Sequence, residues 1–539
     1  MAEFVSAVPD ARSESVLKSD LRRVLRNSLE RRVLGLLSLL LFGLWSLACI
    51  TDYNHPPGTR CVRVLAILIV ALVGRLECRR PWWGFFFLLL YWPQSLAIRE
   101  FGVQFLSPLF EGLPDFWGGP LACALTLGVL ARENVESPLR PSAGRPSPSL
   151  RLFRAALWFF AAAYTLTAVI GYFRLNSPPA DWPVPHASWR VFLNPGVSQL
   201  TPLTSILALL PPLLLGLALL NLLSDKPGAL RPPVQTLIAL CCATGLIAAL
   251  QLFIQIKSGS FGYRFTGGWI PAGPFEHRNT AGPVFALFFA LAVIAAVRAY
   301  RGGKANTAAL FFGCSAVLLL GAYMSTSRNA LFILLALPWL ALLARPTVFR
   351  ASLALLLPAA ALALVFWLPL PHSAGTSQSA LNRILITIEN ARAGELNGVS
   401  GGRTPLFQTA LNIGRDFPLT GAGVGSFPVL ARPDSPYRAP GTVDAYGAAH
   451  SIPLNLFAES GAVTSLGWLL VWVLLPLAAL LRAPRAGGFC VVLLAFGLGN
   501  LVDTMWLVPG ITTFSVILIY LACYELNPTE LTGAAAYPG

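Results

Sequence analysis

Three short polar clusters interrupt a largely apolar sequence, and each holds residues that could bind an anion or move a proton. The first ends in His277, Arg278 and Asn279, the second contains Arg328, and the third contains His450. Each cluster comes directly before a long apolar stretch, where a helix is expected to begin. A helix N-terminus presents unpaired backbone N–H groups and a positive dipole end, which favour an anion. These clusters therefore predict sites for a phosphate or a diphosphate.

A further arginine and one histidine extend this chemistry. Arg403 precedes a short predicted helix in the longest polar segment of the chain. Its guanidinium fork, like that of Arg328, can hold two phosphate oxygens at once. His450 could act differently, because a neutral imidazole can take a proton from a sugar hydroxyl. We expect arginines that hold a charged head group to lie beside a general base.

Each of these residues also has an ordinary interpretation. An arginine at the end of a membrane helix commonly snorkels to the interface, and an exterior histidine commonly makes a surface hydrogen bond. The glycine-rich segment 421–427 is too loose a pattern to indicate phosphate binding by itself. Glu459 could be a packing acid with Asn455 one helical turn before it. The functional interpretation therefore depends on the combination and on where its members lie.

The composition points to a membrane protein. Of 539 residues, 55% are hydrophobic and 12% are charged, about half the charged fraction of a soluble chain. Apolar stretches recur at lengths near the roughly 20 residues that a helix needs to cross a bilayer. The first has no obvious small-residue cleavage site and is predicted to be a true span. Fourteen spans are predicted, at 33–50, 62–76, 81–98, 116–131, 155–173, 200–223, 234–256, 280–297, 307–324, 329–343, 351–370, 453–481, 489–503 and 510–524.

The distribution of basic residues predicts the orientation. A cytoplasmic N-terminus places more than half of the 39 Lys and Arg residues in cytoplasmic segments, as the positive-inside rule requires. Under this orientation all three polar clusters and Arg403 lie on the exterior side. The net charge of +15 thus reflects membrane topology, and nucleic acid is not an expected partner.

The predicted organisation follows from the spans. Residues 1–32 form a cytoplasmic basic segment, 33–370 hold helices 1–11, 371–452 form an exterior loop, 453–524 hold the last helices and 525–539 form a cytoplasmic tail. The fold class is all-α, a polytopic membrane protein of about 12 to 14 helices. No paired cysteine spacing and no cluster of acids occurs in the exterior loops, so neither a disulfide framework nor a metal site is expected.

Two short helices are predicted inside the exterior loop. Leu381, Ile384, Leu385 and Ile388 recur at helical spacing, which predicts an amphipathic helix. In the second helix Thr404 is the expected N-cap, Pro405 the first position, and Gly414 the residue just past the last turn.

In combination and order these motifs resemble the O-antigen ligase and O-antigen polymerase superfamily. The resemblance covers about residues 273–481 and includes the Gly-Pro-Phe-x-His-Arg-Asn element that ends at Asn279. It continues through Ser-Thr-Ser-Arg328 and Gly402-Arg403 to the stretch from His450 to Gly461. The sequence departs from the family pattern in having serine after His450, where asparagine is common, and in two apparent extra spans.

The resemblance implies a bacterial inner-membrane enzyme whose active site faces the periplasm, so that the exterior loop is periplasmic. It implies a glycan donor linked to undecaprenyl diphosphate and an acceptor hydroxyl on lipid A core, on another glycan or on a protein. Arg328 and Arg403 would bind the diphosphate, and His450 would activate the acceptor. His277, Arg278 and Asn279 would be further substrate-binding residues, and no cofactor is implied.

Ligase, polymerase and protein O-oligosaccharyltransferase activities all stay open within this class, because the acceptor cannot be read from the sequence. A transporter or flippase is the alternative from a different class. Transporters usually place ionisable or helix-breaking groups near the bilayer midplane, whereas here the polar groups collect at one rim of the predicted bundle. A rim location favours chemistry at the interface.

Overall fold

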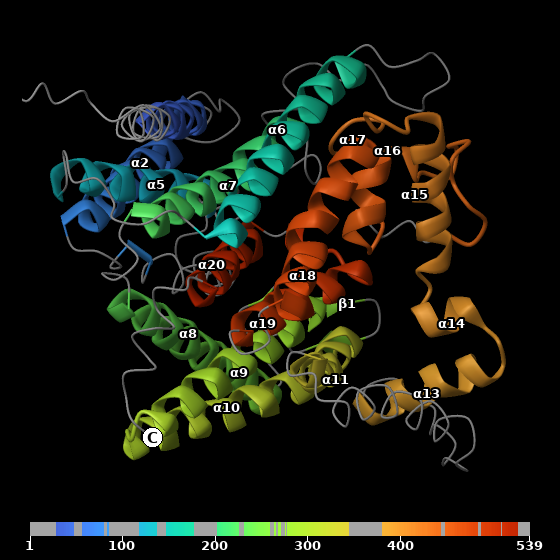
Figure 1. Ribbon diagram of the computed structural model, residues 1–539. Coiled ribbons are helices and arrows are strands. Elements are labelled where there is room, and N and C mark those ends of the chain that lie inside the picture. The colour runs from blue at the N-terminus through green and yellow to red at the C-terminus, as the bar shows by residue number, and fades with distance from the viewer. Residues whose placement is uncertain are drawn as a thin grey trace, which may run out of the picture.

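A computed structural model describes the helical body of the protein (Figure 1). The residues described are 28–47, 57–79, 84–85, 118–136, 147–176, 202–225, 231–258, 263–265, 268–270, 275, 278–343, 380–442, 448–482, 487–507 and 509–526. The predicted spans 81–98 and 351–370 lie almost wholly outside them, as does His277. Within the described residues the regular secondary structure is helical apart from one short antiparallel hairpin of β1 (Tyr263–Phe265) and β2 (Gly268–Ile270). The all-α prediction is confirmed.

Six of the described helices are long and apolar enough to cross a membrane. They cover Pro148–Arg174, Ser205–Leu223, Val234–Lys257, Arg278–Arg301, Ala305–Met324 and Ile452–Arg482. Four shorter apolar helices cover Gly119–Ala131, Arg328–Leu342, Gly488–Leu501 and Gly510–Glu525. The protein is therefore a multi-pass membrane protein.

The helices pack in two connected groups. In the first, α5 (Gly118–Glu136), α6 (Pro148–Asn176) and α20 (Pro509–Glu525) surround α7 (Pro202–Asp225), and α2 (Pro57–Arg79) packs on α5. In the second, α8 (Arg231–Ser258), α10 (Ala305–Met324), α11 (Arg328–Leu343) and α19 (Gly488–Leu501) surround α9 (Arg278–Arg301). The groups meet where α19 packs on α20.

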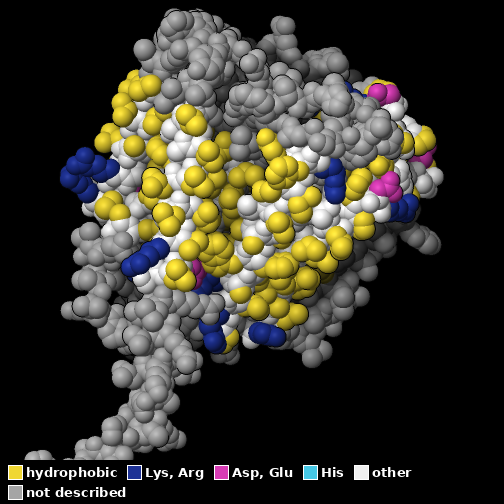
Figure 2. All heavy atoms as spheres, turned by 90° about the horizontal axis from the view of Figure 1, so that it is seen from above, with side chains coloured by type: hydrophobic (Ala, Val, Ile, Leu, Met, Phe, Trp, Pro, Cys, Tyr) yellow, Lys and Arg dark blue, Asp and Glu magenta, His cyan; other side chains and the backbone are white. Residues whose placement is uncertain are grey.

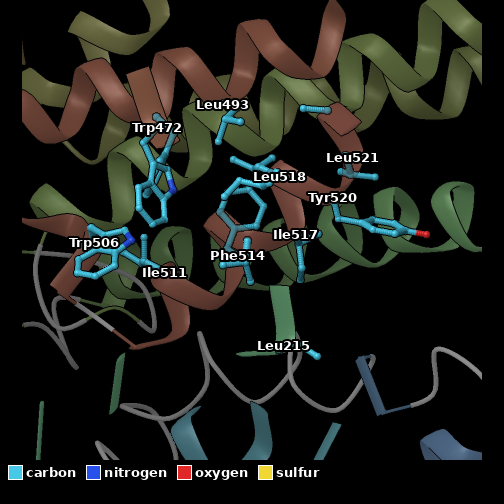
Figure 3. Close-up of a cluster of buried hydrophobic side chains, with 14 of the residues drawn as sticks. Leu215, Trp472, Leu493, Trp506, Ile511, Phe514, Ile517, Leu518, Tyr520 and Leu521 are labelled. Carbon is cyan, nitrogen blue, oxygen red and sulfur yellow. The ribbon is translucent and has the colours of Figure 1, made fainter. Parts of the chain in front are cut away.

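One long kinked helix runs beside both groups. It consists of α17 (Ile452–Leu469), a π-helical turn η4 (Leu470–Leu474) and α18 (Leu475–Arg482). Its aromatic side chains join Trp506 of the 3₁₀ turn η6 (Met505–Leu507) in a buried cluster (Figure 3). The Trp472 ring lies 5.4 Å from that of Trp506, and Phe160 of α6 meets both rings edge-on. This cluster holds η6 against α6 and the kinked helix.

The outer surface carries large apolar side chains where a soluble protein would carry charges. On α6, Leu152, Phe159, Leu166 and Phe173 are exposed at a spacing of seven residues, so they form one stripe along the helix. Figure 2 shows hydrophobic side chains over much of the described surface of one face, with scattered Lys and Arg and few acidic residues. Such a surface suits contact with lipid.

The predicted exterior loop contains four short helices and shares a small buried core with α17. The helices are α13 (Ala380–Arg392), α14 (Leu396–Ser400), α15 (Thr404–Asp416) and α16 (Phe427–Leu430), and Figure 1 shows α13 to α15 along one edge of the molecule. The buried residues of this core are Leu406, Ala410, Ile413, Ala422, Phe427, Leu430, Ala431, Tyr437, Ala449 and Ala458. Helices at α13 and α15 were both predicted, and both are confirmed.

The predicted ends of α15 were wrong. Arg403 is the N-cap residue, and the Ser400 hydroxyl accepts hydrogen bonds from the N–H groups of Arg403 and Thr404, each at 3.1 Å. Thr404 therefore begins the helix instead of capping it. Gly414 lies inside the helix, which continues to Asp416, and a Cβ there would sit 2.3 Å from the Phe457 ring of α17. This glycine serves close packing of α15 on α17.

Candidate functional site

The turn between α10 and α11 positions Arg328. Thr326 has φ +53°, a left-handed conformation that is uncommon for a residue with a side chain, and the turn is tied together by the N–H of Ser327 bonding to the Ser325 hydroxyl. Gly282 of α9 packs directly on this turn, since a Cβ there would lie 2.3 Å from Ser325 Oγ. Arg278 begins α9 one helical turn before Gly282. The first turns of α9 and α11 are therefore neighbours.

The Arg328 side chain reaches from α11 to the loop helices. Its Nη1 lies 3.4 Å from Thr387 Oγ1 on α13. Its Nη2 occupies the space that a Cβ on Gly401 would need, at 1.8 Å from that position. Gly401, at φ +71°, ends α14 two residues before Arg403. The guanidinium of Arg328 thus lies against the segment that carries Arg403.

Arg403 and His450 share one acidic partner, Asp503. The Nη2 atom of Arg403 is 3.4 Å from Asp503 Oδ2, and Nη1 donates to the carbonyl of Val502. The Nδ1 atom of His450 is 3.3 Å from Asp503 Oδ1. The residues just before α15 and α17 therefore meet at a carboxylate just beyond the end of α19.

Asp503 sets the chemistry available to His450. With the carboxylate as acceptor, Nδ1 carries the proton and Nε2 keeps its lone pair. Burial raises the pKa of Asp503, but the hydrogen bond from His450 and the charge of Arg403 outweigh it, so the pKa lies below the usual value for an aspartate. Asp503 is therefore ionised at neutral pH and holds the imidazole in one tautomer.

The segment that carries Asp503 is firmly anchored. Asn500 Oδ1 accepts a hydrogen bond from the N–H of Trp506 at 2.8 Å, and the Trp506 indole is buried in the aromatic cluster. On the other side, Asn329 Nδ2 of α11 contacts the sulfur of Met505 at 3.7 Å. The residue next to Arg328 thereby touches the turn that follows Asp503, which links the arginine of α11 to the histidine–aspartate pair.

His450 itself has a constrained backbone. Its φ is +53°, so it shares the left-handed conformation of Thr326. Such conformations cost of order 1–3 kcal/mol and concentrate at functional sites. Ser451, extended at φ −154°, is the N-cap residue of α17 and carries no side-chain cap. The chain therefore turns sharply at His450 before the helix begins.

A loop enters a break in α17 just beyond this point. Gly461 has φ +78°, and the helix is interrupted there. The N–H of Ala462 donates to the carbonyl of Pro418 at 2.7 Å. The carbonyl of Ala458 would bond to that N–H in a regular helix, and it accepts the N–H of Ala422 at 2.8 Å instead. Segment 417–423 thus supplies the backbone hydrogen bonds that the broken helix lacks. The glycine-rich sequence serves this insertion, because a Cβ on Gly421 would clash with the backbone of Glu459.

Arg174 holds the same loop to the end of α6. Its Nη2 lies 3.3 Å from Thr420 Oγ1, its Nη1 donates to the Gly421 carbonyl, and its guanidinium stands 4.6 Å from the centre of the Phe417 ring. Neither Arg174 nor this contact was anticipated from the sequence. The loop is therefore fixed from two sides, by α6 and by α17.

The sequence-predicted residues are placed as follows. Arg328, Arg403 and His450 are joined through Gly401 and Asp503. Arg278 and Asn279 begin α9, beside the α10–α11 turn, and both are partly exposed. His277 lies outside the described residues.

Asp503 is the candidate site residue that sequence reasoning missed. The predicted span 489–503 included it, whereas α19 ends at Leu501. An acid between two apolar helices is costly in a membrane protein and indicates a functional site. That signal was present in the sequence and could have found it.

No group of three His, Cys, Asp or Glu residues that could hold a metal ion occurs among the described residues. The described part of the site presents two arginines, one histidine and one aspartate. These groups can bind an anion and move a proton.

The fold and site define a class, a polytopic helical membrane protein with arginines and a histidine–aspartate pair gathered at its helix ends. Residues 313–469 match the family model described as O-antigen ligase. This match includes Arg328, Arg403 and His450 and ends before Asp503, and it confirms the resemblance to the O-antigen ligase superfamily. It supports a glycan-processing membrane enzyme of the ligase or polymerase type, with a lipid-linked glycan and a glycan acceptor as its substrates. No curated protein matches the chain.

Proposed function

We propose that this protein is a glycosyltransferase that moves a glycan from an undecaprenyl-diphosphate-linked donor to an acceptor hydroxyl at the periplasmic face, in the manner of an O-antigen ligase. The observation that carries the proposal is the junction at Asp503, which pairs with His450 at 3.3 Å and with Arg403 at 3.4 Å. A base held in one tautomer beside anion-binding arginines is what transfer from a diphosphate requires.

The reaction is a direct displacement. Nε2 of His450 takes the proton of the acceptor hydroxyl while that oxygen forms a bond to the anomeric carbon of the donor. The bond from this carbon to the diphosphate oxygen breaks, and the undecaprenyl diphosphate leaves with the electron pair. Arg328 and Arg403 offset the charge that develops on the leaving diphosphate. A single displacement inverts the anomeric centre and needs no metal ion.

The arrangement of helix ends supports a site at one membrane face. Arg278, Arg328 and Ser451 each start a helix or cap its first turn, and Asp503 follows the C-terminal end of α19. The opposite ends of α9 and α20 carry Arg298 and Glu525, which form an ion pair with each other. The positive-inside distribution of Lys and Arg assigns the Arg298 end to the cytoplasm. The proposed site accordingly faces the periplasm.

The acceptor is the open part of this proposal. Lipid A core, a second lipid-linked repeat and a protein Ser or Thr each present a hydroxyl that His450 could deprotonate. Ligase, polymerase and protein O-oligosaccharyltransferase activities are the corresponding alternatives, and the acceptor that receives the glycan distinguishes them.

The testing experiment supplies the purified, membrane-reconstituted protein with a defined undecaprenyl-diphosphate glycan and each acceptor class in turn. We expect glycan on one acceptor class, release of undecaprenyl diphosphate and an inverted anomeric configuration in the product. Transfer should be unaffected by a chelator of divalent ions. Retention of configuration, or a loss of transfer that added metal restores, would contradict the mechanism, and movement of intact donor across the membrane without transfer would indicate a flippase.

A further inference from the structure

Two buried polar residues of α17 connect the α16 segment to the backbone beside His450. The N–H of Phe427 donates to Glu459 Oε1 at 3.0 Å. Glu459 Oε2 accepts from Asn455 Nδ2 at 3.1 Å, and Asn455 Oδ1 accepts from the N–H of Ala449 at 3.0 Å. Asn455 is 1% exposed and Glu459 is 7% exposed. The three hydrogen bonds form one continuous relay that is shielded from water.

The relay ends at the residue before a strained one. His450 has φ +53°, and its ring must stay within reach of Asp503 to remain in one tautomer. A residue other than glycine stays in this conformation only where its surroundings hold it there. The hydrogen bond from the Ala449 N–H to Asn455 fixes the chain immediately before His450. The helical hydrogen bond from the Asn455 N–H to the Ser451 carbonyl, at 2.8 Å, fixes the chain immediately after it.

The far end of the relay is fixed as well. Phe427 is fully buried in the small core that the loop shares with α17, and the loop segment before it is inserted into the break of α17. The N–H of Gly423 donates to the carbonyl of Glu459 at 2.9 Å, so the loop contacts both the backbone and the side chain of this residue. The relay therefore couples the packing of the loop to the conformation at His450.

We propose that Asn455 and Glu459 are positioning residues for glycan transfer, which hold His450 in its left-handed conformation and thereby aim its imidazole between Asp503 and the acceptor. The inference rests on the proposed function, because it assigns the relay a purpose only if His450 is the base. Asn455 and Glu459 act through the backbone of the Ala449–His450 segment, and neither is assigned contact with a substrate.

The decisive test exchanges the two polar groups. Asn455→Asp keeps the acceptor for the Ala449 N–H but removes the donor to Glu459, and it brings two carboxylates together. Glu459→Gln keeps the acceptor for the Phe427 N–H but turns an amide donor toward the amide of Asn455. In the double variant the new glutamine donates to the new aspartate, and every hydrogen bond of the relay can form again with the same net charge. We expect kcat to fall about tenfold or more in each single variant and to recover to within about threefold in the double variant.

The control is Ser465→Ala. Its hydroxyl donates to the Pro453 carbonyl at 2.8 Å, so it also ties the first turn of α17, but this hydrogen bond is not one of the three of the relay. We expect its kcat to stay within about threefold of the wild-type value. The donor KM should stay within about threefold in the single relay variants as well, because the arginines are untouched. A fall in kcat for Ser465→Ala as large as for the relay variants would overturn the positioning role.

The remaining outcomes are distinguishable. If the wild-type protein transfers no glycan to any acceptor class, the proposed function fails. If His450→Ala retains transfer, the base assignment fails and the relay proposal fails with it. If His450→Ala is inactive while both single relay variants keep wild-type kcat, the relay proposal fails and the proposed function stands. Where a single variant does not fold, the double variant decides alone: a folded double variant with wild-type kcat supports the relay, and a folded one with lost kcat overturns it. A double variant that fails to fold also overturns it, because the exchanged hydrogen bonds should sustain the same structure.

Discussion

Two arginine–carboxylate pairs lie at opposite ends of α19, and only one of them has the features of a reaction centre. Arg403 pairs with Asp503 beyond the end of α19, and Arg298 pairs with Glu525 at the far end of α9 and α20. The second pair is completed by local structure: Glu525 accepts the N–H of Phe489 at 2.8 Å, and Arg298 stands 4.3 Å from the centre of the Phe489 ring. It ties the start of α19 to the C-terminal ends of α9 and α20.

The pair at Asp503 differs in what it adds. Its carboxylate also binds a histidine with a left-handed backbone, and its arginine comes from a loop helix 100 residues away in the chain. A strained residue beside a buried acid lowers the stability of the fold. An ion pair that only joins helix ends does not require such a residue. The comparison indicates that an ion pair at the ends of membrane helices marks a functional site when it also orients a third, titratable group, as Asp503 orients His450.

The largest expected effect on the transfer rate comes from His450, which contacts the Arg403–Asp503 pair and has no counterpart at the Arg298–Glu525 pair among the described residues. Replacing His450 with alanine should lower transfer by about 10²- to 10⁴-fold, because the general base is lost. Donor binding, measured separately with labelled lipid-diphosphate glycan, should be retained. Transfer at the wild-type rate would remove the base assignment and with it the distinction between the two ends.

Neutralising Asp503 and Glu525 in turn compares the two pairs most directly, because only Asp503 is expected to affect kcat. Asp503→Asn keeps the shape but no longer favours the productive tautomer of His450, so kcat should fall by about 10²-fold. The matched variant Glu525→Gln should keep kcat within about threefold and lower only the unfolding temperature. Both variants are compared by initial rates and by thermal unfolding in the same lipid. Equal losses of kcat would show that the two pairs are alike.

Removal of an arginine side chain should affect use of the donor. Arg328→Ala is expected to raise the donor KM about tenfold or more, because a charge-assisted contact to phosphate is lost. Arg403→Ala should raise the donor KM and also lower kcat, since Arg403 supports Asp503. Donor titrations at saturating acceptor give both constants. Unchanged donor kinetics in both variants would reject their role as a diphosphate clamp.

A pair of adjacent glycines offers a milder test of Arg328. Gly401 and Gly402 both have positive φ, at +71° and +83°, so alanine strains the backbone at either position. Only at Gly401 would the new Cβ meet the Arg328 guanidinium, whereas nothing lies within 4 Å of a Cβ at Gly402. Gly401→Ala should therefore raise the donor KM about three- to tenfold more than Gly402→Ala. Equal donor KM values would mean that the position of Arg328 does not matter.

The smallest effect is a pH dependence of stability. The pKa of Asp503 is lower in the folded protein than the ordinary value of about 3.9. A depressed folded pKa stabilises the protein above the unfolded value and loses this effect as the pH falls through the folded value. The gap in unfolding temperature between wild type and Asp503→Asn should therefore persist from pH 7 to about 5 and narrow below about 4. A gap that is already lost at pH 6 would contradict the ionised state of Asp503.

Local sequence patterns predicted much of this molecule. The apolar stretches gave the helices, since a span is recognised from about 20 consecutive residues. The amphipathic pattern gave α13, and the polar residues before apolar runs gave Arg328 and His450. Gly414 was misjudged, because a glycine at a helix end and a glycine at a close helix contact look alike in a sequence. Only the position of Phe457 on another helix distinguishes the two.

Long-range partners could not be predicted in the same way. Asp503 is 53 residues from His450 and 100 from Arg403, and nothing in the local pattern indicates which apolar helix brings it to them. The same holds for Arg174, which reaches Thr420 across 246 residues. Sequence identified residues that could do chemistry, and packing determined which of them share a partner.

The break at Gly461 has a consequence for the order of assembly. The carbonyls of Ala458 and Glu459 and the N–H of Ala462 are satisfied by segment 417–423, and leaving such groups unpaired in an apolar surrounding costs several kcal/mol each. That segment precedes α17 in the chain and therefore leaves the ribosome first. Segment 417–423 is thus synthesised before α17, so it is available to bond the free backbone groups at the break when α17 folds.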